Sequence, residues 1–166
     1  VSSEIYQSSP TIVLNLNHIR FELVPAIVKW NGYQIPSPSS SFIDWLSTDP
    51  NGFNSSLTKR NMENNNLIKP LVRLVKYWNA LNGRYFATFD LESNVVNNMY
   101  FYGASNLRDY FYSYWEKFNY NYDTAQYIKD KVDSTKRKVQ AIKKDEQDGY
   151  PNLAQADMEK LLPNLS

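Results

Sequence analysis

The chain of 166 residues has no cysteine and only one histidine, His18. The absence of cysteine excludes disulfides and thiolate-bound metals, and a single histidine cannot complete a usual zinc site. A chain without cysteine fits a reducing compartment, so we expect a cytoplasmic protein. His18 could serve as a general base, although its position in an expected turn favours a solvated ring.

Several other signals are also missing. No run of about 20 apolar residues occurs, so we expect no membrane span. Residues 1–10 are polar and lack the apolar centre of a signal peptide. Neither a glycine-rich phosphate loop nor a nucleophile–base signature is present. The formal charge of +1 gives no broad basic surface and argues against nucleic acid as a partner, although a local pocket could still bind a small charged ligand.

The first part of the chain has the pattern of β-strands. Residues 11–16 are β-branched and apolar, and residues 19–24 alternate between two faces, with Asn17-His18 as a turn between them. Residues 33–35 could form a further short strand. Residues 36–56 are rich in serine, proline, asparagine and glycine, which predicts a long loop. We therefore expect a hairpin in which Glu22 lies on the face opposite Phe21.

The rest of the chain has helical periodicity. Apolar residues at helical spacing predict a helix over residues 67–81, with Gly83 as its C-terminal cap. Three more helices are predicted at residues 91–102, 106–118 and 124–147, and residues 157–162 could add a final turn or two. The tyrosine-rich stretch within residues 100–122 suggests either base stacking or, at helical spacing, core packing.

These elements predict an α+β fold that is mainly helical, with a short β-hairpin followed by a helical domain. Two or three strands do not form a self-sufficient sheet. Either the helices cover the strands, or chain outside this sequence completes the sheet.

Glu22 is the first residue that could carry chemistry. Magnesium prefers carboxylate oxygens, and two-metal phosphoryl transfer needs several carboxylates that converge. The alternative is a solvated acid on a strand face, which spacing alone favours.

Lys76 and Thr88 are candidates for phosphate binding. A lysine offers a compact charge on a long arm. A threonine at a helix N-terminus lies where free N–H groups bind anions, if Thr88 is an N-cap. The alternatives are a snorkelling surface lysine and an ordinary cap. Asp90 and Glu92 follow Thr88 closely and weigh against a phosphate site unless they point away.

Three segments, in this order, carry a family resemblance: the strand from Ile19 to Ala26, the loop with Trp45 and Thr48-Asp49-Pro50, and the helix containing Lys76-Tyr77-Trp78-Asn79. Together they resemble the second half of bacterial cyclic oligonucleotide synthases, which are nucleotidyltransferases related to oligoadenylate synthetases. The resemblance covers roughly residues 10–118. It implies that residues 1–36 are C-terminal strands of the catalytic core and residues 37–166 a helical domain beside the nucleotide cleft.

The resemblance also implies roles for single residues. Glu22 would be the third catalytic carboxylate and a metal ligand, although aspartate is commoner there. Lys76 would reach the triphosphate of the nucleotide, and Thr88, in a stretch similar to the family's Ser-Tyr-x-Leu-Glu, would join it. The loop with Trp45 and Asp49 could position structure or contact nucleotide.

The remaining two carboxylates should form an acid-x-acid pair after a Gly-Ser, and none of the five glycines is followed by serine. We therefore expect these carboxylates in an N-terminal catalytic segment that is missing here, and an isolated chain without activity. The complete enzyme would join nucleoside triphosphates with Mg²⁺ and serve in bacterial antiviral defence. The alternative is a non-catalytic helical module that binds a nucleotide or a partner protein.

Overall fold

The computed structural model describes residues 4–8, 11–37, 44–100 and 104–163. The chain divides into two compact units, Val1–Ser55 and Ser56–Ser166, and each is described by itself. The described part is mainly helical with two small antiparallel sheets, which confirms the predicted α+β class. The predicted division at residue 36 is of another kind, because it separates strands of a catalytic core from a helical domain of an enzyme. It stays a prediction.

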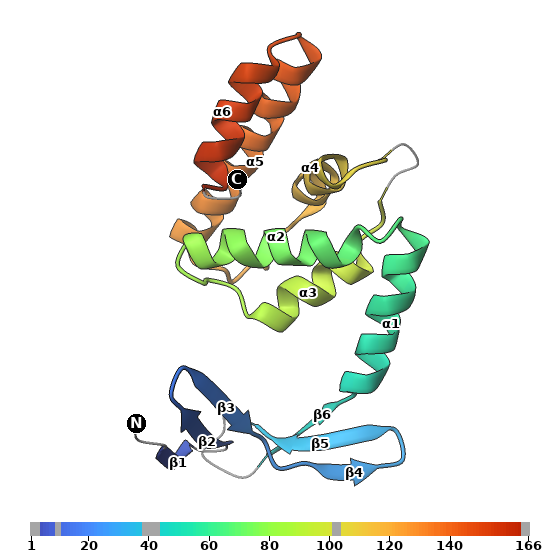
Figure 1. The fold of residues 1–166 in the computed structure, drawn as a ribbon, viewed down its shortest axis with the longest axis vertical. Helices are drawn as coiled ribbons and strands as arrows, with labels where there is room; N and C mark the ends of the chain where they lie inside the picture. Colours follow the sequence, from blue (N-terminus) through green and yellow to red (C-terminus); the bar gives the residue numbers. More distant parts are fainter. Residues whose placement is uncertain (1–3, 9–10, 38–43, 101–103, 164–166) are drawn as a thin grey trace. The chain divides into compact units, whose positions relative to one another are not determined.

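The first sheet consists of β1 (Glu4–Ser8), β2 (Thr11–Leu16) and β3 (Ile19–Leu23), with β2 in the centre (Figure 1). The predicted hairpin of β2 and β3 is confirmed: Leu16 pairs with Ile19 across the two-residue turn, where Asn17 has a φ of 53°. Asparagine tolerates this left-handed conformation better than most residues, and tight hairpin turns need it.

The register gives this sheet one face of mixed polarity and one apolar face. Val13 lies opposite both Tyr6 and Glu22, whereas Leu14 lies opposite Ile5 and Phe21. Because paired residues point to the same side, Glu22 shares its face with Val13 and Tyr6 and not with Phe21. The alternation predicted for this strand is therefore confirmed. The other face collects large apolar side chains that are exposed among the described residues: Ile5, Ile12, Leu16, Ile19, Phe21 and Leu23.

The second sheet consists of β4 (Ile27–Lys29), β5 (Gly32–Pro36) and β6 (Trp45–Thr48). Its last strand and the helix α1 (Pro50–Glu63) lie where a long loop was predicted, so that prediction is wrong.

The error has a local cause. Asp49 accepts a hydrogen bond from the backbone N–H of Gly52 (2.9 Å), and Pro50 is the first residue of α1. Aspartate and proline favour turns, but they equally favour the start of a helix. Residues 38–43, within the same predicted loop, lie outside the described residues.

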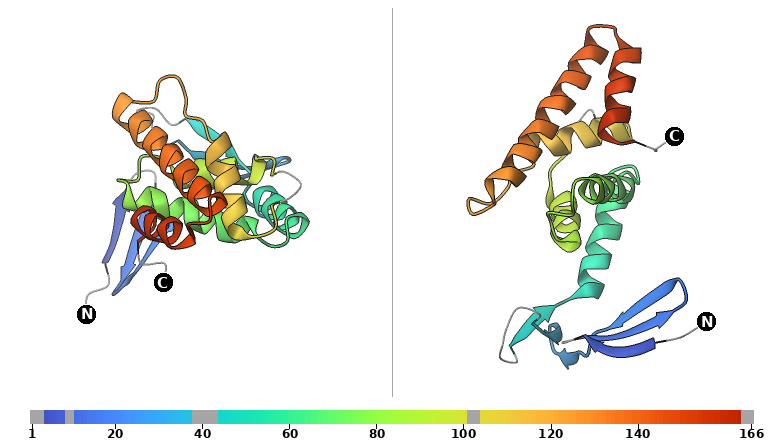
Figure 2. Two further views of the ribbon diagram at one scale, coloured as in Figure 1. Left: turned by 90° about the horizontal axis from the view of Figure 1, so that it is seen from above. Right: turned by 90° about the vertical axis from the view of Figure 1, so that its left-hand side faces the viewer.

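Five further helices follow: α2 (Ile68–Leu81), α3 (Thr88–Asn97), α4 (Leu107–Lys117), α5 (Gln126–Gln147) and α6 (Pro151–Leu161). α2, α4 and α5 lie close to the predicted helices. α3 begins three residues before the predicted helix 91–102 and ends at Asn97, and residues 101 and 102 lie outside the described residues. α6 is longer than predicted because Pro151 begins it. Gly83, with a φ of 97°, follows the end of α2 as predicted. Figure 2 shows α5 and α6 as an antiparallel pair. None of the described helices combines the length and apolar character needed to span a membrane.

The core of the helical unit combines aliphatic side chains with a cluster of aromatic ones. Trp78 of α2 meets Trp115 of α4 edge to face at 4.5 Å, and its indole N–H donates to the hydroxyl of Thr135 on α5 (3.1 Å). Six aromatic residues of the tyrosine-rich stretch are buried: Tyr110, Phe111, Tyr112, Tyr114, Trp115 and Phe118. Most of that stretch therefore packs in the core, while Tyr122 is 99% exposed.

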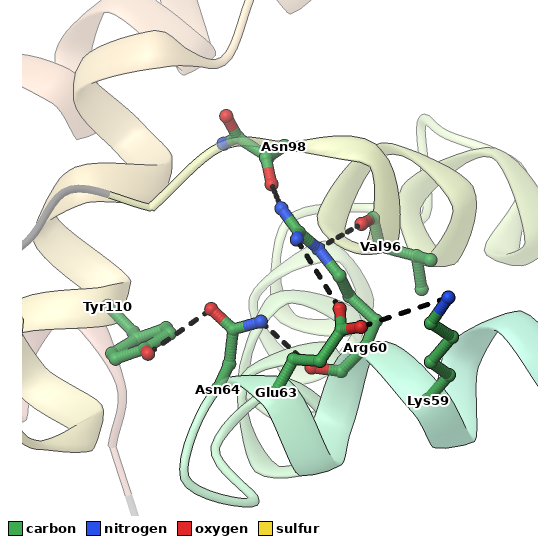
Figure 3. A network of polar contacts seen from close by, with 7 residues as sticks. All are labelled: Lys59, Arg60, Glu63, Asn64, Val96, Asn98 and Tyr110. Atoms are coloured by element: carbon green, nitrogen blue, oxygen red, sulfur yellow. Dashed lines mark hydrogen bonds and ion pairs between the residues drawn. The ribbon is translucent and has the colours of Figure 1, made fainter.

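A polar network joins α1 to the end of α3 (Figure 3). Arg60 donates to the carbonyls of Val96 (3.3 Å) and Asn98 (2.8 Å), and its other guanidinium nitrogen lies 3.8 Å from Glu63. These carbonyls are among the last of α3, where a cation complements the helix dipole. Arg60 thus fixes the C-terminal end of α3, the helix that begins with Thr88.

Candidate nucleotide-binding site

Lys76 lies in the middle of α2 and forms an ion pair with α3. Its ammonium nitrogen is 2.9 Å from Oε2 of Glu92, and the two side chains are only 34% and 21% exposed. Lys76 is therefore not a snorkelling lysine that extends into open solvent. It is held at the contact between two helices.

Thr88 is the first residue of α3 and is exposed, but it is not the N-cap. Ala87 occupies the cap position, and no side chain caps this helix. The condition that Thr88 is the N-cap is therefore not met, since the helix begins one residue earlier than a Thr88 cap would require. The threonine nevertheless remains within the first turn of α3, at the positive end of the helix dipole.

Thr88 and Glu92 are four residues apart on α3, so they share one face of the helix, with Cβ atoms about 5–6 Å apart. Lys76 touches Glu92 on that face. The structure thus brings the ammonium of Lys76 to within about one helical turn of Thr88. Asp90, two residues from each, is exposed and belongs to another face.

Asn79 is a residue of this region that the sequence reasoning did not single out. Its side-chain amide donates to the carbonyl of Phe86 (2.8 Å) and accepts from the N–H of the same residue (3.2 Å). Asn79 is buried, and it lies one turn beyond Lys76 on α2. It acts as a two-pronged clamp that fixes the loop leading to Thr88. The signal that could have found it is an asparagine among the apolar residues of an otherwise regular helical stripe.

Glu22 belongs to the other unit. It is 54% exposed on β3, and Arg20 lies 2.7 Å from its carboxylate. Among the described residues, no group of three or more histidine or acidic side chains could hold a metal ion. One carboxylate that is already paired with a cation does not fit a magnesium site. The roles of Glu22 and of Mg²⁺ stay predictions for a longer protein.

The segment with Trp45, Thr48 and Asp49 is a strand followed by the start of a helix, and not a loop. Trp45 and Thr48 are the first and last residues of β6, and Asp49 caps α1. Positioning of structure and contact with nucleotide both stay predictions for this segment.

Comparisons with known proteins show what the chain is similar to. Residues 1–61 match the family model of the Second Messenger Oligonucleotide or Dinucleotide Synthetase domain (SMODS). A protein of Bacillus cereus (strain VD146), named "Probable cyclic nucleotide synthase", is 26% identical over 125 residues. That match covers 69% of this chain and 37% of the relative, so the chain spans well under half of the relative's length. The predicted resemblance to bacterial cyclic oligonucleotide synthases is thereby confirmed as a similarity.

Proposed function

We propose that this chain is part of a nucleotidyltransferase that joins nucleoside triphosphates into cyclic oligonucleotides. In each step a ribose hydroxyl oxygen attacks an α-phosphorus, a new P–O bond forms, and the bond to the β-phosphate breaks with release of pyrophosphate. In this proposal α2 and α3 form one wall of the nucleotide site. The enzyme would act in the cytoplasm, and its product would serve antiviral defence by activating a separate effector.

One observation supports the proposal that α2 and α3 line the nucleotide site: together they place a partly exposed lysine near a helix N-terminus. Lys76 provides a positive charge, and the start of α3 at Thr88 provides backbone N–H groups. This combination suits a polyphosphate. The family match supports the reaction, and the relative's name supports a cyclic nucleotide as product.

The test is product formation by the full-length protein that carries this sequence. It is incubated with all four nucleoside triphosphates and Mg²⁺ or Mn²⁺, and the products are separated by chromatography. A cyclic product that resists phosphatase, because it has no terminal phosphate, supports the proposal. Absence of any product and of pyrophosphate release, over a range of bacterial triggers, counts against it.

A non-catalytic helical module is the second candidate. It is favoured by the ion pair of Lys76 with Glu92 and by the lack of a metal-binding group among the described residues. The two candidates differ in one cheap observation, the coding sequence upstream of Val1. A Gly-Ser followed by an acid pair there favours the enzyme, and a start codon at Val1 favours the module.

A further inference from the structure

The ion pair of Lys76 and Glu92 raises a question about the proposed phosphate site. The ammonium of Lys76 is the only group proposed to bring a full positive charge to the phosphates, yet a carboxylate oxygen lies 2.9 Å from it. The ammonium carries three N–H donors, and Glu92 accepts from one of them. Two donors therefore remain for a ligand.

The charge of Glu92 is the more important factor. A phosphate oxygen that contacts the same ammonium would come within a few ångströms of this carboxylate. Like charges at such distances repel, and the partial burial of both side chains reduces the screening by water and salt. Glu92 therefore lowers the affinity of Lys76 for phosphate, although it keeps the lysine on the face of α3 that carries Thr88.

We propose that Glu92 is an internal counter-ion, which holds the ammonium of Lys76 in the absence of nucleotide and competes with the triphosphate for it. This inference rests on the proposed function. It assigns to Glu92 a role in tuning affinity: the acid positions Lys76 and prevents polyphosphates from binding too tightly. Glu92 contacts Lys76 and is not itself a phosphate ligand.

The test compares single variants of the chain by titration with inorganic tripolyphosphate, which has the phosphates of the substrate but no base. Glu92→Gln keeps the volume and hydrogen-bonding capacity of the side chain and removes its charge. We expect this variant to bind tripolyphosphate about fivefold more tightly, the size of a partly exposed charge interaction. The gain should shrink as salt is added.

Glu116→Gln is the matched control. It removes the same charge from another cross-helix pair, in which Lys143 lies 2.6 Å from Glu116 with both side chains partly exposed. Both variants have the same net charge, so a general electrostatic effect would change both affinities equally. We expect Glu116→Gln to bind as the wild type does. In the double variant Lys76→Ala/Glu92→Gln, the gain should disappear.

The outcomes separate the inference from the function on which it rests. If Lys76→Ala weakens binding but Glu92→Gln leaves it unchanged or weaker, the counter-ion role is wrong and the phosphate site stands. If wild type and Lys76→Ala bind equally, or neither binds, both the site and the counter-ion role are wrong. An equal gain for Glu92→Gln and Glu116→Gln also overturns the inference.

Discussion

At the scale of single residues, Lys76 offers the most direct test of the phosphate site. Lys76→Ala should weaken the binding of a non-hydrolysable nucleoside triphosphate by about tenfold or more, because a charge-assisted contact contributes about 1.5–3 kcal/mol. Binding of the nucleoside alone should change much less. Lys143→Ala, which removes a lysine from another ion pair, is the control. Equal affinities for wild type and Lys76→Ala would place the cleft elsewhere.

In the same titration, Thr88→Ala should weaken triphosphate binding less than Lys76→Ala, because a neutral hydroxyl contributes only about 0.5–1.5 kcal/mol. Since Ala87 occupies the cap position, no loss of helix stability from a missing cap is expected. A Thr88→Ala variant that unfolds more easily would contradict this description of the helix start.

Glu22 is tested in the full-length protein. Glu22→Gln should abolish turnover and leave the fold intact, because glutamine keeps the volume and loses the charge that would balance a metal ion. Product formation is measured together with circular dichroism. Arg20→Gln, on the same face of β3, is the control: it breaks the same ion pair as Glu22→Gln but keeps the carboxylate of Glu22. A near-normal rate for Glu22→Gln would make Glu22 an ordinary strand acid.

At the scale of elements, the clamp of Asn79 can be removed without touching Lys76 or Thr88. Asn79→Ala should lower the free energy of unfolding by about 1–3 kcal/mol, since two hydrogen bonds are lost and groups of Phe86 lose their partner. Urea titration measures this. The control is Asn94→Ala at an exposed position of α3, where about 0.5 kcal/mol or less is expected. Equal effects would show that the clamp is unimportant.

The buried tyrosine Tyr112 of α4 should make the stability of the fold sensitive to alkaline pH. Burial, and then the charge of Glu146, raise the pKa of Tyr112 to about 12. An unfolded tyrosine ionises near pH 10, so between about pH 10 and 12 the unfolded chain releases a proton that the folded chain keeps. The stability from this group is complete below pH 10 and is lost as the pH rises to 12. Urea unfolding at several pH values should show a smaller loss for Tyr112→Phe.

Tyr122→Phe is the control for this alkaline experiment, because Tyr122 is 99% exposed. Its stability should fall with pH in parallel with that of the wild type. Identical pH dependence for Tyr112→Phe and the wild type would contradict the role of burial.

The elements also show what a sequence reveals and what it conceals. The β2–β3 hairpin and the end of α2 at Gly83 follow from local rules, turn residues and periodicity, and both could be predicted. Strand β1 is short and mixes polar residues with Ile5 and Tyr6, and its pairing with β2 is a contact that no local pattern reveals. The start of α1 was hidden because Asp49 and Pro50 serve turns and helix starts equally well.

The candidate site was predictable only in part. Lys76 and Thr88 could be selected from motif order, but the ion pair with Glu92 arises from the packing of α2 on α3. The sequence showed two acids after Thr88 and could not show that one of them faces the lysine. The clamp of Asn79 depends likewise on the path of a loop, which side-chain periodicity does not describe.

At the scale of the whole molecule, the chain alone should make no cyclic nucleotide. Two-metal catalysis needs converging carboxylates, and the described residues offer no such group. Incubation with four nucleoside triphosphates and Mg²⁺ or Mn²⁺ tests this. Pyrophosphate release well above that of a Glu22→Ala control would contradict the prediction and would show that this chain holds a catalytic centre of its own.

The hydrogen bonds of Arg60 at one end of α3 affect the position of the other end. Arg60 is hydrogen-bonded to the C-terminal end of α3. Thr88 begins the other end, about 15 Å away along a ten-residue helix. A helix of this length rotates as a rigid body. If α3 pivots about its Arg60 end by about 10°, Thr88 is displaced by roughly 2–3 Å, enough to make or break a contact with a phosphate. The contacts of one guanidinium therefore affect the position of Thr88, a candidate phosphate-binding residue at the far end of the helix.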